Sequence, residues 1–580
     1  MPVEARKRTM PWLAAMALCG AAPASHAGPQ MANRVEIDKN DYPHARCNDD
    51  TQATYYLLGA GPGGAVSGRK WLVFLHGGGS CSSDESCAER WYDPDGGPDG
   101  IIGFHGNMTA ETSPTKNFNG EGLLDFDGVD SVGNQGVNPF AGFNRIMVPY
   151  CSSDTYAGRN TASRAVNYAA LLGTPVTVGG ETKTLANPAG LPPLSSIRFS
   201  GQHIVEAVID LVMNGGVKTG RKTGNDGATF VEPPSAADDE IVLSGSSAGG
   251  GGVIRNLDNV ARQVLNAAAN VKVYGIVDAS NDVGILPDAT ITGEGNYAAA
   301  AFWGATSAED IDTSCQAMHP LASSRRCFNS AVLLRNFIET PHYVIQNSYD
   351  QVTHAGQVQF FTEQLMLQGV PAAMAGNLAT DYVRNQVSRG ASELGGGVAD
   401  KQKVGWFIPN YAEPHHQLAV EDTWFFNSPL AFDTFGGNDP RLGSDKRSPM
   451  GLPQGLACFR FKVTGQGSGC VNSTDAKVVN TTYPTNPLTA SYDAATSTLT
   501  LPLVRLSNST YFKNVTVTLN PLGNVAVNDA SVGGPGTVNG YDLVNNVLTL
   551  PSVSVGGTIY QQVKVSGPGL RVVGYEEVKF

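Results

Sequence analysis

The sequence predicts an α/β protein, a mostly parallel sheet with helices on both faces, followed by a small all-β module. Between about residues 70 and 410, short β-branched runs alternate with helical stretches, which is typical of a parallel sheet. From about residue 480, charge thins out and short alternating runs rich in Thr, Val and Asn take over. The formal net charge of −13 argues against a surface for nucleic acid or anionic membranes.

The first 27 residues predict a cleaved export signal. A basic stretch at 6–8 precedes an apolar stretch at 10–22 and a small-x-small sequence at 25–27. Pro and Gly residues within this stretch argue against a core helix. We therefore expect a secreted or periplasmic protein after cleavage near Ala27, and the later sequence contains no apolar run long enough to span a membrane.

Eight cysteines remain beyond the predicted signal, an even number that favours disulfide bonds in an exported protein. Three pairs are close in sequence and the fourth follows by elimination. Zinc binding is the alternative, but the sequence contains no CxxC pair. The expected pairs are Cys81 with Cys87, Cys315 with Cys327, Cys458 with Cys470, and Cys47 with Cys151.

Residues 28–430 are expected to form the α/β domain. A helix is predicted over 201–213, where Ile204, Val205 and Val208 begin an apolar stripe at helical spacing. Functional groups of such folds gather at the carboxyl ends of the strands. The strand candidates are 71–76, 144–150, 240–244, 271–278, 342–348 and 403–408.

The rest of the chain divides into a connecting segment at 431–479, with a Cys458–Cys470 hairpin, and a β-rich module at 480–580. The run from Tyr492 to Pro502 recurs from Tyr541 to Pro551, an offset of 49 residues. Each copy of about 25 residues is too small to bury its own core, so the copies are expected to pack together. The module either binds a polymer surface or acts as a spacer, and its repeated tyrosines are expected to be core aromatics.

The strongest local motif is the G-x-S-x-G sequence around Ser247, which follows an apolar strand run and precedes a helical one. In this pattern Gly245 and Gly249 permit a sharp strand-to-helix turn that exposes the serine hydroxyl. The helix behind it directs its first N–H groups towards an anion formed there. The motif predicts Ser247 as a nucleophile, and a glycine-rich surface loop is the alternative.

A second glycine run, Gly77-Gly78-Gly79, directly follows the strand candidate 71–76. Backbone N–H donors stabilise the oxyanion of acyl transfer by roughly 3–4 kcal/mol each. Glycine suits such a loop because no side chain blocks close approach and unusual backbone angles are accessible. We therefore expect oxyanion donors at Gly78, Gly79 and Ala248.

A serine nucleophile needs a histidine base, and an acid that orients that base. The chain order Ser, acid, His of α/β-hydrolases favours His415 as base, with adjacent His416 as the alternate. Asp350 follows the strand candidate 342–348 and is the preferred acid, with Asp278 as the alternative. No ligand stands at i+3 or i+4 from the two histidines, so we expect no metal and no organic cofactor.

These residues together resemble the pectin acetylesterase/Notum family of carboxylester hydrolases. The resemblance covers roughly residues 47–430 and implies an α/β-hydrolase fold, with Ser247, Asp350 and His415 as the catalytic triad. It also implies hydrolysis of an ester, which in relatives is an acetyl on pectin or a fatty acyl on a protein. The motifs that carry it are Gly77-Gly78 with Cys81, Asn144-Arg145, Tyr150-Cys151, Gly158, Ser247-Ala248-Gly249-Gly250, Asp278-Ala279 with Asp282, Asp350-Gln351, His415-His416-Gln417 and Asp422-Thr423-Trp424-Phe425.

The chain departs from the family at three places. His76 stands where an acidic residue is usual, Gly79 where Trp is usual, and His416 where plant relatives have Cys. The acyl preference of relatives therefore does not transfer. We expect a secreted serine esterase that removes acyl groups, acetyl above all, from an extracellular polysaccharide such as pectin, without an obligatory protein partner. The alternatives are a depolymerase or esterase for a polyester or acylated lipid, and a non-catalytic binding protein.

Overall fold

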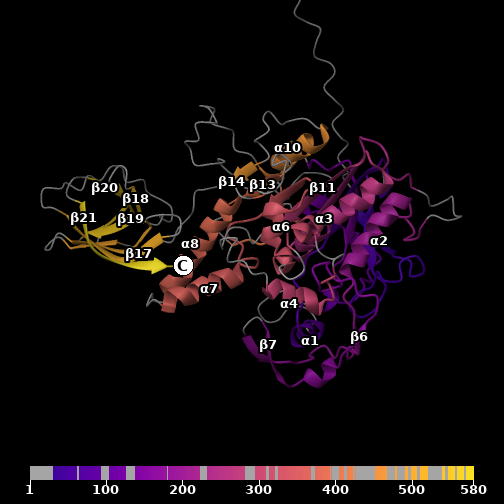
Figure 1. Cartoon of the computed structure of the whole chain (residues 1–580), viewed down its shortest axis with the longest axis horizontal. Helices are drawn as coiled ribbons and strands as arrows, with labels where there is room; N and C mark the ends of the chain where they lie inside the picture. Colours follow the sequence, from indigo (N-terminus) through magenta and orange to yellow (C-terminus); the bar gives the residue numbers. More distant parts are fainter. Residues whose placement is uncertain are drawn as a thin grey trace, which may run out of the picture.

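The structure is a computed structural model of the whole chain (Figure 1). It describes the hydrolase-like part from residue 30 onwards and, as backbone strands, the C-terminal module. The described residues are 30–61, 64–92, 104–125, 138–178, 181–222, 231–280, 294–307, 312–319, 324–367, 372–391, 394, 404–409, 414–421, 425, 451–466, 477–479, 490–493, 498–505, 510–519, 539–542, 547–555, 558–566 and 570–579.

One ten-stranded sheet organises residues 30–479, in the order β14-β13-β12-β11-β10-β3-β5-β2-β1-β4. The strands from β5 to β14 in this order are parallel to one another, and β2, β1 and β4 add antiparallel pairings at one edge. The strands are β1 (Met31–Glu36), β2 (Thr54–Leu58), β3 (Lys70–Leu75), β4 (Thr115–Asn117), β5 (Asn144–Val148), β10 (Glu240–Ser246), β11 (Lys272–Asp278), β12 (His342–Ile345), β13 (Val404–Ile408) and β14 (Lys477–Val479).

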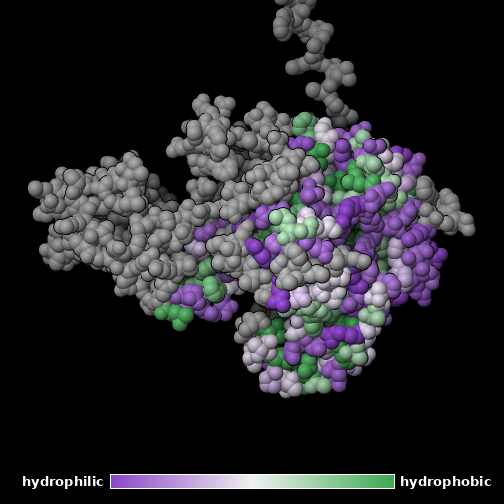
Figure 2. Space-filling view, viewed as in Figure 1, coloured by the Kyte–Doolittle hydropathy of each residue, from purple (hydrophilic) through white to green (hydrophobic). Residues whose placement is uncertain are grey.

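Helices cover both faces of this sheet, which is therefore buried. Two apolar clusters share its strands: one contains the inner faces of α2 and α3, and the other contains that of α10. Figure 1 shows α2 and α10 on opposite sides of the strands, and Figure 2 shows the outer side of α2 as largely hydrophilic. The α-helices are α1 (Asp84–Tyr92), α2 (Gly201–Asn214), α3 (Ala248–Ala267), α4 (Glu294–Phe302), α5 (Thr313–Met318), α6 (Ser330–Asn336), α7 (Ala355–Leu367), α8 (Ala372–Gly390) and α10 (Leu452–Thr464).

Smaller elements fill the connections between these strands and helices. Two short ribbons, β6 (Arg164–Ala165) with β9 (Ser196–Ile197) and β7 (Pro175–Val178) with β8 (Glu181–Thr184), lie between β5 and α2. The 3-10 helices are η2 (His105–Asn107), η3 (Gly122–Leu124), η4 (Tyr168–Leu171) and η6 (Ser324–Phe328). The predicted α/β-hydrolase-type architecture is confirmed: every predicted strand coincides with an observed one to within three residues at each end.

The segment 431–479 differs from the expected connector, because it adds a strand to the edge of the sheet and a helix to one of its faces. β14 pairs in parallel with β13, and α10 packs Phe459 against Tyr274 and Tyr343 of the strands. Arg460 of α10 also binds the fully buried carboxylate of Glu240, at 2.7 and 2.9 Å. The expected hairpin is wrong, since Cys458 lies in a helix, and the α/β unit extends past 430 to β14.

Three of the four expected disulfides are present: Cys47–Cys151, Cys81–Cys87 and Cys315–Cys327. Cys470 and the predicted signal at 1–27 lie outside the described residues. Disulfides of this kind are typical of proteins in oxidising compartments. None of the described helices is both long and apolar enough to cross a bilayer.

The C-terminal module forms a separate seven-stranded sheet, drawn in yellow in Figure 1. The repeat seen in the sequence is also a repeat of pairing: Tyr492 pairs with Leu499 and, 49 residues later, Tyr541 pairs with Leu548. The strands are β15 (Ala490–Asp493), β16 (Thr498–Arg505), β17 (Thr510–Leu519), β18 (Asn539–Asp542), β19 (Val547–Val555), β20 (Thr558–Ser566) and β21 (Leu570–Lys579).

The two copies pair with each other reciprocally. β15 of the first copy lies parallel to β19 of the second, with Ala490 opposite Val553. β18 of the second lies parallel to β16 of the first, with Asn539 opposite Val504, which is the same pair with the copies exchanged. Such reciprocity is the mark of a two-fold relation. Neither copy forms its sheet alone, which agrees with the expectation that they pack together.

Candidate active site

Ser247 lies on a strained turn between β10 and α3. Its backbone angles, φ 55° and ψ −125°, are rare for a residue with a side chain and cost of order 1–3 kcal/mol. A Cβ on Gly249 would lie 1.9 Å from the carbonyl oxygen of Leu75, so only glycine fits there. A Cβ on Gly245 would lie 2.4 Å from the carbonyl oxygen of Gly249. The two glycines of the motif are therefore required by close packing of the turn.

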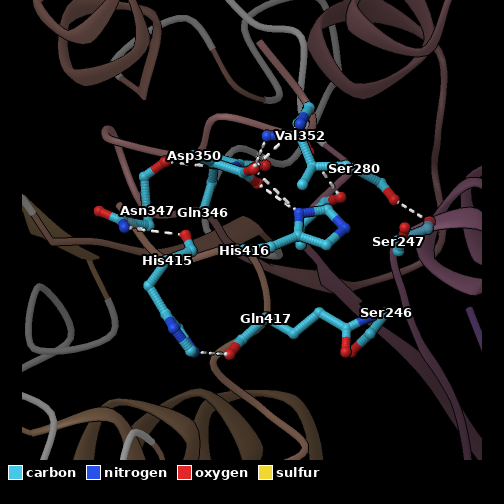
Figure 3. Close-up of polar contacts among 12 residues, drawn as sticks. Ser246, Ser247, Ser280, Gln346, Asn347, Asp350, Val352, His415, His416 and Gln417 are labelled. Atoms are coloured by element: carbon cyan, nitrogen blue, oxygen red, sulfur yellow. Dashed lines mark hydrogen bonds and ion pairs between the residues drawn. The ribbon is translucent and has the colours of Figure 1, made fainter. Parts of the chain in front are cut away.

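Two hydrogen bonds hold this turn from the neighbouring strand. The N–H of Ser247 donates to the carbonyl oxygen of Asp278 at 2.9 Å, and Ser280 Oγ donates to the carbonyl oxygen of Ser247. The strained conformation is thus fixed by the last residue of β11, Asp278, and by Ser280 just after it. Figure 3 shows Ser247 and Ser280 at one side of the site, with Asp350 at the other.

Asp350 is a buried carboxylate surrounded by donors. Oδ1 accepts the N–H groups of Val352 and Thr353 at 2.9 Å each, and Oδ2 accepts Gln346 Nε2 at 2.8 Å. Burial disfavours the charge, but the hydrogen bond and charge of His416 outweigh it, and the pKa of Asp350 lies below its usual value. The carboxyl is therefore ionised at neutral pH and available to orient a base.

The base that Asp350 contacts is His416, the alternate in the sequence prediction, and not the favoured His415. His416 Nδ1 lies 2.9 Å from both carboxylate oxygens of Asp350. His416 Nε2 is buried and has no hydrogen-bond partner among the described residues. Figure 3 shows the ring between Asp350 and Ser247. His416, not its neighbour, therefore completes the line from acid to nucleophile.

His415 faces away from this line. Its Nε2 lies 2.6 Å from the carbonyl oxygen of Gln417, and 3.8 Å from Glu421. Burial lowers the pKa of His415, so its ring is neutral at neutral pH and donates to Gln417. Sequence order could not separate two adjacent histidines, because the choice depends on which way the backbone of their loop turns.

The loop that carries both histidines is held by contacts from distant parts of the chain. Asn347 Nδ2 donates to the carbonyl oxygen of His415 at 2.9 Å, and the N–H of His415 donates to the carbonyl oxygen of Tyr349 at 3.1 Å. The N–H of Leu123 donates to the carbonyl oxygen of Ala419 at 2.7 Å. These bonds join the histidine loop to the loop of Asp350 and to the segment before β5.

The glycine run after β3 lies beside the nucleophile. A Cβ on Gly77 would lie 2.8 Å from the Cβ of Ser247, and Gly78 and Gly79 have φ values of 146° and 67°. These angles favour glycine and place an unusual bend beside the serine. Gly78 and Gly79 follow Gly77 in this loop, and Ala248 is the first residue of α3, directly after Ser247. Their role as oxyanion donors stays a prediction.

Arg90 supports this bend, a role that no sequence motif indicated. It is 4% exposed, and its guanidinium donates to Ser153 Oγ at 2.8 Å and to the carbonyl oxygen of Gly78. Because the C=O and N–H of a trans peptide point in opposite directions, this bond directs the N–H of Gly79 away from Arg90. The Cys81–Cys87 disulfide ties the same helix, α1, to the end of the loop.

Among the described residues, no histidine ring donates a hydrogen bond to Asp278, the alternative acid. Its carboxylate accepts hydrogen bonds from Ser246, Leu418 and Ala419. Asp282, which belongs to the same motif, lies outside the described residues. Asp350 is therefore the acid that the geometry selects.

Two small hollows flank the histidine loop. One, of about 270 Å³, is lined by Phe74, His76, Glu121 and Gln417 among others. The other, of about 300 Å³, is lined by Val352, His415 and His416. Burial lowers the pKa of His76 to about 4, so this residue is neutral where relatives are expected to carry an acid. Within the described ranges, no three His, Cys, Asp or Glu side chains lie close enough to hold a metal ion.

Comparison with known proteins assigns the chain to a family. The sequence profile described as "Pectinacetylesterase" matches residues 27–224 and 234–435, more than half of its length. The protein belongs to the pectinacetylesterase family. Both matched stretches end before α10 and the C-terminal module, which lie outside the profile.

Curated relatives of this pectinacetylesterase-family chain carry carboxylesterase names. "Palmitoleoyl-protein carboxylesterase NOTUM" of Homo sapiens is 31% identical over 124 residues, which are 21% of this chain and 20% of that protein. "Palmitoleoyl-protein carboxylesterase notum2" of Xenopus laevis is 30% identical over 113 residues, 19% of this chain and 18% of that protein. The matches span about a fifth of the length of these two relatives.

Membership of the family does not by itself carry activity. "Inactive palmitoleoyl-protein carboxylesterase notum1b" of Danio rerio is 30% identical over 126 residues, 22% of this chain and 73% of that protein. A solved structure, the "Wnt deacylase Notum" from Drosophila, is 21% identical, covers 78% of this chain and 99% of its own, and has a TM-score of 0.48. The activity of this chain must therefore be argued from its own residues.

Proposed function

We propose that this protein is a serine carboxylester hydrolase in which Ser247, His416 and Asp350 form the catalytic triad. The observation that carries the proposal is the placement of His416. One ring nitrogen is bound to both oxygens of an ionised carboxylate. The other is buried on the side of Ser247 and has no hydrogen-bond partner in the described part of the chain (Figure 3). This is the arrangement that a general base for a serine nucleophile requires.

In the first half-reaction, His416 Nε2 accepts the proton of Ser247 Oγ while that oxygen attacks the ester carbonyl carbon. The tetrahedral oxyanion accepts hydrogen bonds from the N–H groups of Gly78, Gly79 and Ala248. His416 then donates the proton to the departing alkoxide, and the C–O bond of the ester breaks. Asp350 holds the tautomer with the proton on Nδ1 and stabilises the imidazolium.

In the second half-reaction, water replaces the alcohol. His416 accepts a proton from the water as its oxygen attacks the acyl-enzyme, and Ser247 Oγ leaves and regains that proton. The products are a carboxylic acid and an alcohol, and the enzyme returns to its starting state. No step calls for a metal or an organic cofactor.

For the substrate, we propose short acyl groups, acetyl above all, on an extracellular polysaccharide such as pectin. Two observations support this: the description of the family and the predicted export signal.

A second candidate is an esterase for longer acyl chains, on a lipid, a polyester or a protein. The palmitoleoyl substrate in the names of the relatives favours it, as does Gly79, where a Cβ would find its nearest described atom 3.5 Å away. This glycine leaves room at the mouth of the oxyanion loop for a bulkier acyl group.

The test combines labelling and hydrolysis with the full-length protein. A fluorophosphonate probe should label Ser247, as mapped by peptide mass spectrometry, and Ser247→Ala should abolish both the label and p-nitrophenyl acetate hydrolysis. A ladder of p-nitrophenyl esters from C2 to C16, with acetylated pectin and acetylated xylan alongside, separates the substrate candidates. Unchanged hydrolysis by folded Ser247→Ala would contradict the mechanism, and a maximum at C8 or longer would favour the second candidate.

A further inference from the structure

The mechanism gives no role to the buried carboxylate of Asp278, which lies beside the proposed triad. Asp278 ends β11, is 1% exposed, and contacts no histidine ring in the described structure. A carboxylate in such a position is costly unless it accepts several hydrogen bonds. The groups that donate to it come from the two segments on which the nucleophile and the base are carried.

Oδ2 of Asp278 is the shared acceptor. It accepts Ser246 Oγ at 2.6 Å from the nucleophile turn, and the N–H groups of Leu418 and Ala419 at 3.2 and 3.1 Å from the histidine loop. The backbone carbonyl of the same residue accepts the N–H of Ser247 at 2.9 Å. Asp278 is thus hydrogen-bonded to Ser246 and Ser247 on the turn of the proposed nucleophile. It is also hydrogen-bonded to Leu418 and Ala419, which follow His416 in the histidine loop.

We propose that Asp278 is the positioning residue that sets the separation between Ser247 and His416. This inference rests on the proposed esterase function. The physical reason is that two loops joined to one atom have little freedom relative to one another, whereas each loop alone would move with its own tip. A displacement of about 1 Å between reacting groups costs on the order of 100-fold in rate.

The surroundings of Asp278 also make this link sensitive to pH. The titratable side chain that faces it is His416, from the histidine loop; β10 presents the hydroxyl of Ser246, and β12 presents Ile345 in register. Burial raises the pKa of Asp278 to about 6. As the pH falls through this value, the carboxyl gains a proton, loses acceptor capacity towards the two N–H groups, and holds the histidine loop less firmly.

The first test measures turnover per active site. Wild type, Asp278→Ala and Ser246→Ala, all full length, are titrated with a fluorophosphonate and assayed on p-nitrophenyl acetate. We expect Asp278→Ala to lower kcat per titrated site roughly 100-fold with KM within about threefold, because the link acts on the reacting groups and not on binding. Ser246→Ala, which leaves the link to the histidine loop, should lose less than tenfold. Full kcat per titrated site in Asp278→Ala would overturn the proposal.

The second test uses the near-isosteric variant Asp278→Asn, which decides the question even where the alanine variant does not fold. An amide keeps one acceptor oxygen, so kcat near pH 8 should stay within about tenfold of wild type. As the pH falls through about 6, kcat/KM of wild type should lose up to about tenfold in a step that Asp278→Asn does not show, because the amide cannot gain that proton. The same pH profile in both proteins would overturn the proposal.

The outcomes separate this inference from the function on which it rests. If wild type neither hydrolyses esters nor labels at Ser247, the proposed function is wrong. If wild type is active but the Asp278 variants match it in kcat and pH profile, the esterase stands and the positioning role is wrong.

Discussion

The nucleophile turn and the histidine loop lie side by side, yet they are built in different ways. The turn at Ser247 is defined by neighbours in sequence, because Gly245 and Gly249 leave room for the backbone that crosses them. The histidine loop is defined by distant residues: Asn347, Asp278 and Leu123 each bind a backbone group of that loop.

The difference teaches where local sequence is sufficient. A turn held by short-range packing leaves a motif, and a loop held by long-range hydrogen bonds does not. Variants at the two sites should therefore have different structural effects. A substitution around Ser247 should distort the turn itself, whereas a substitution around His416 should displace a loop that several hydrogen bonds hold together. Four experiments test this contrast, from the largest expected effect to the smallest.

Replacement of the two adjacent histidines by alanine, one at a time, should give the largest change in kcat. His416→Ala should lower kcat about 10⁴-fold or more, because the general base is lost. His415→Ala should lower kcat less than tenfold, since the Nε2 of this ring lies against the carbonyl oxygen of Gln417 and not on the line from Asp350 to Ser247. Steady-state kinetics on p-nitrophenyl acetate check both. Equal losses would show that either ring can reach Ser247, and the reverse order would restore His415 as base.

Loss of Arg90 tests the oxyanion loop. Arg90→Met removes the bond to the Gly78 carbonyl and should lower kcat on the order of 100-fold, comparable to the loss of one oxyanion donor. The matched variant Arg90→Lys keeps the charge but not the fork of donors, so it should recover only part of the rate. Turnover per fluorophosphonate-titrated site is the measurement. Wild-type turnover in Arg90→Met would show that Arg90 does not support the oxyanion loop.

Loss of Asn347 tests the attachment of the histidine loop. Asn347→Ala should lower kcat about tenfold and the free energy of unfolding by about 1–3 kcal/mol, because the carbonyl of His415 loses its buried donor. Urea unfolding and kinetics on the same samples check this.

A control separates stability from positioning. Asn329→Ala removes the N-cap of α6, which lies away from the site, and should cost about 1 kcal/mol with kcat unchanged. If both variants lower kcat alike, general loosening and not the loop bond is responsible.

Removal of the C-terminal module gives the smallest effect. A chain that ends after Val479 keeps the ten-stranded sheet, so hydrolysis of a soluble ester should stay within about twofold of wild type. A chain that ends at residue 430 loses α10 and β14, exposes Tyr274 and Tyr343, and should fail to accumulate as folded protein. Soluble expression and p-nitrophenyl acetate hydrolysis check both. An active protein ending at 430 would restore the shorter domain boundary.

Strand positions and the strained turn at Ser247 could be predicted because their determinants are local. Continuous apolar runs identify strands that are buried on both faces, and β3, β10 and β11 are such strands. The disulfides Cys81–Cys87 and Cys315–Cys327 were predictable because their cysteines are close in sequence. The prediction failed at 431–479, where α10 looked like a linker although it packs on Tyr274 and Tyr343, more than 100 residues before it in the chain.

The sequence by itself determined the strained turn at Ser247, the carboxylate of Asp350 in the loop after β12 and the repeat of the C-terminal strands. Each depends on residue types whose effect is short-range: glycines that admit a crossing backbone, a carboxylate after a strand, and a recurring hairpin. Only the tertiary structure decided that His416 and not His415 meets Asp350, that Arg90 holds Gly78, and that Asp278 joins the two catalytic loops. Those choices depend on hydrogen bonds between segments far apart in the chain, and a linear pattern carries no record of which way a loop turns.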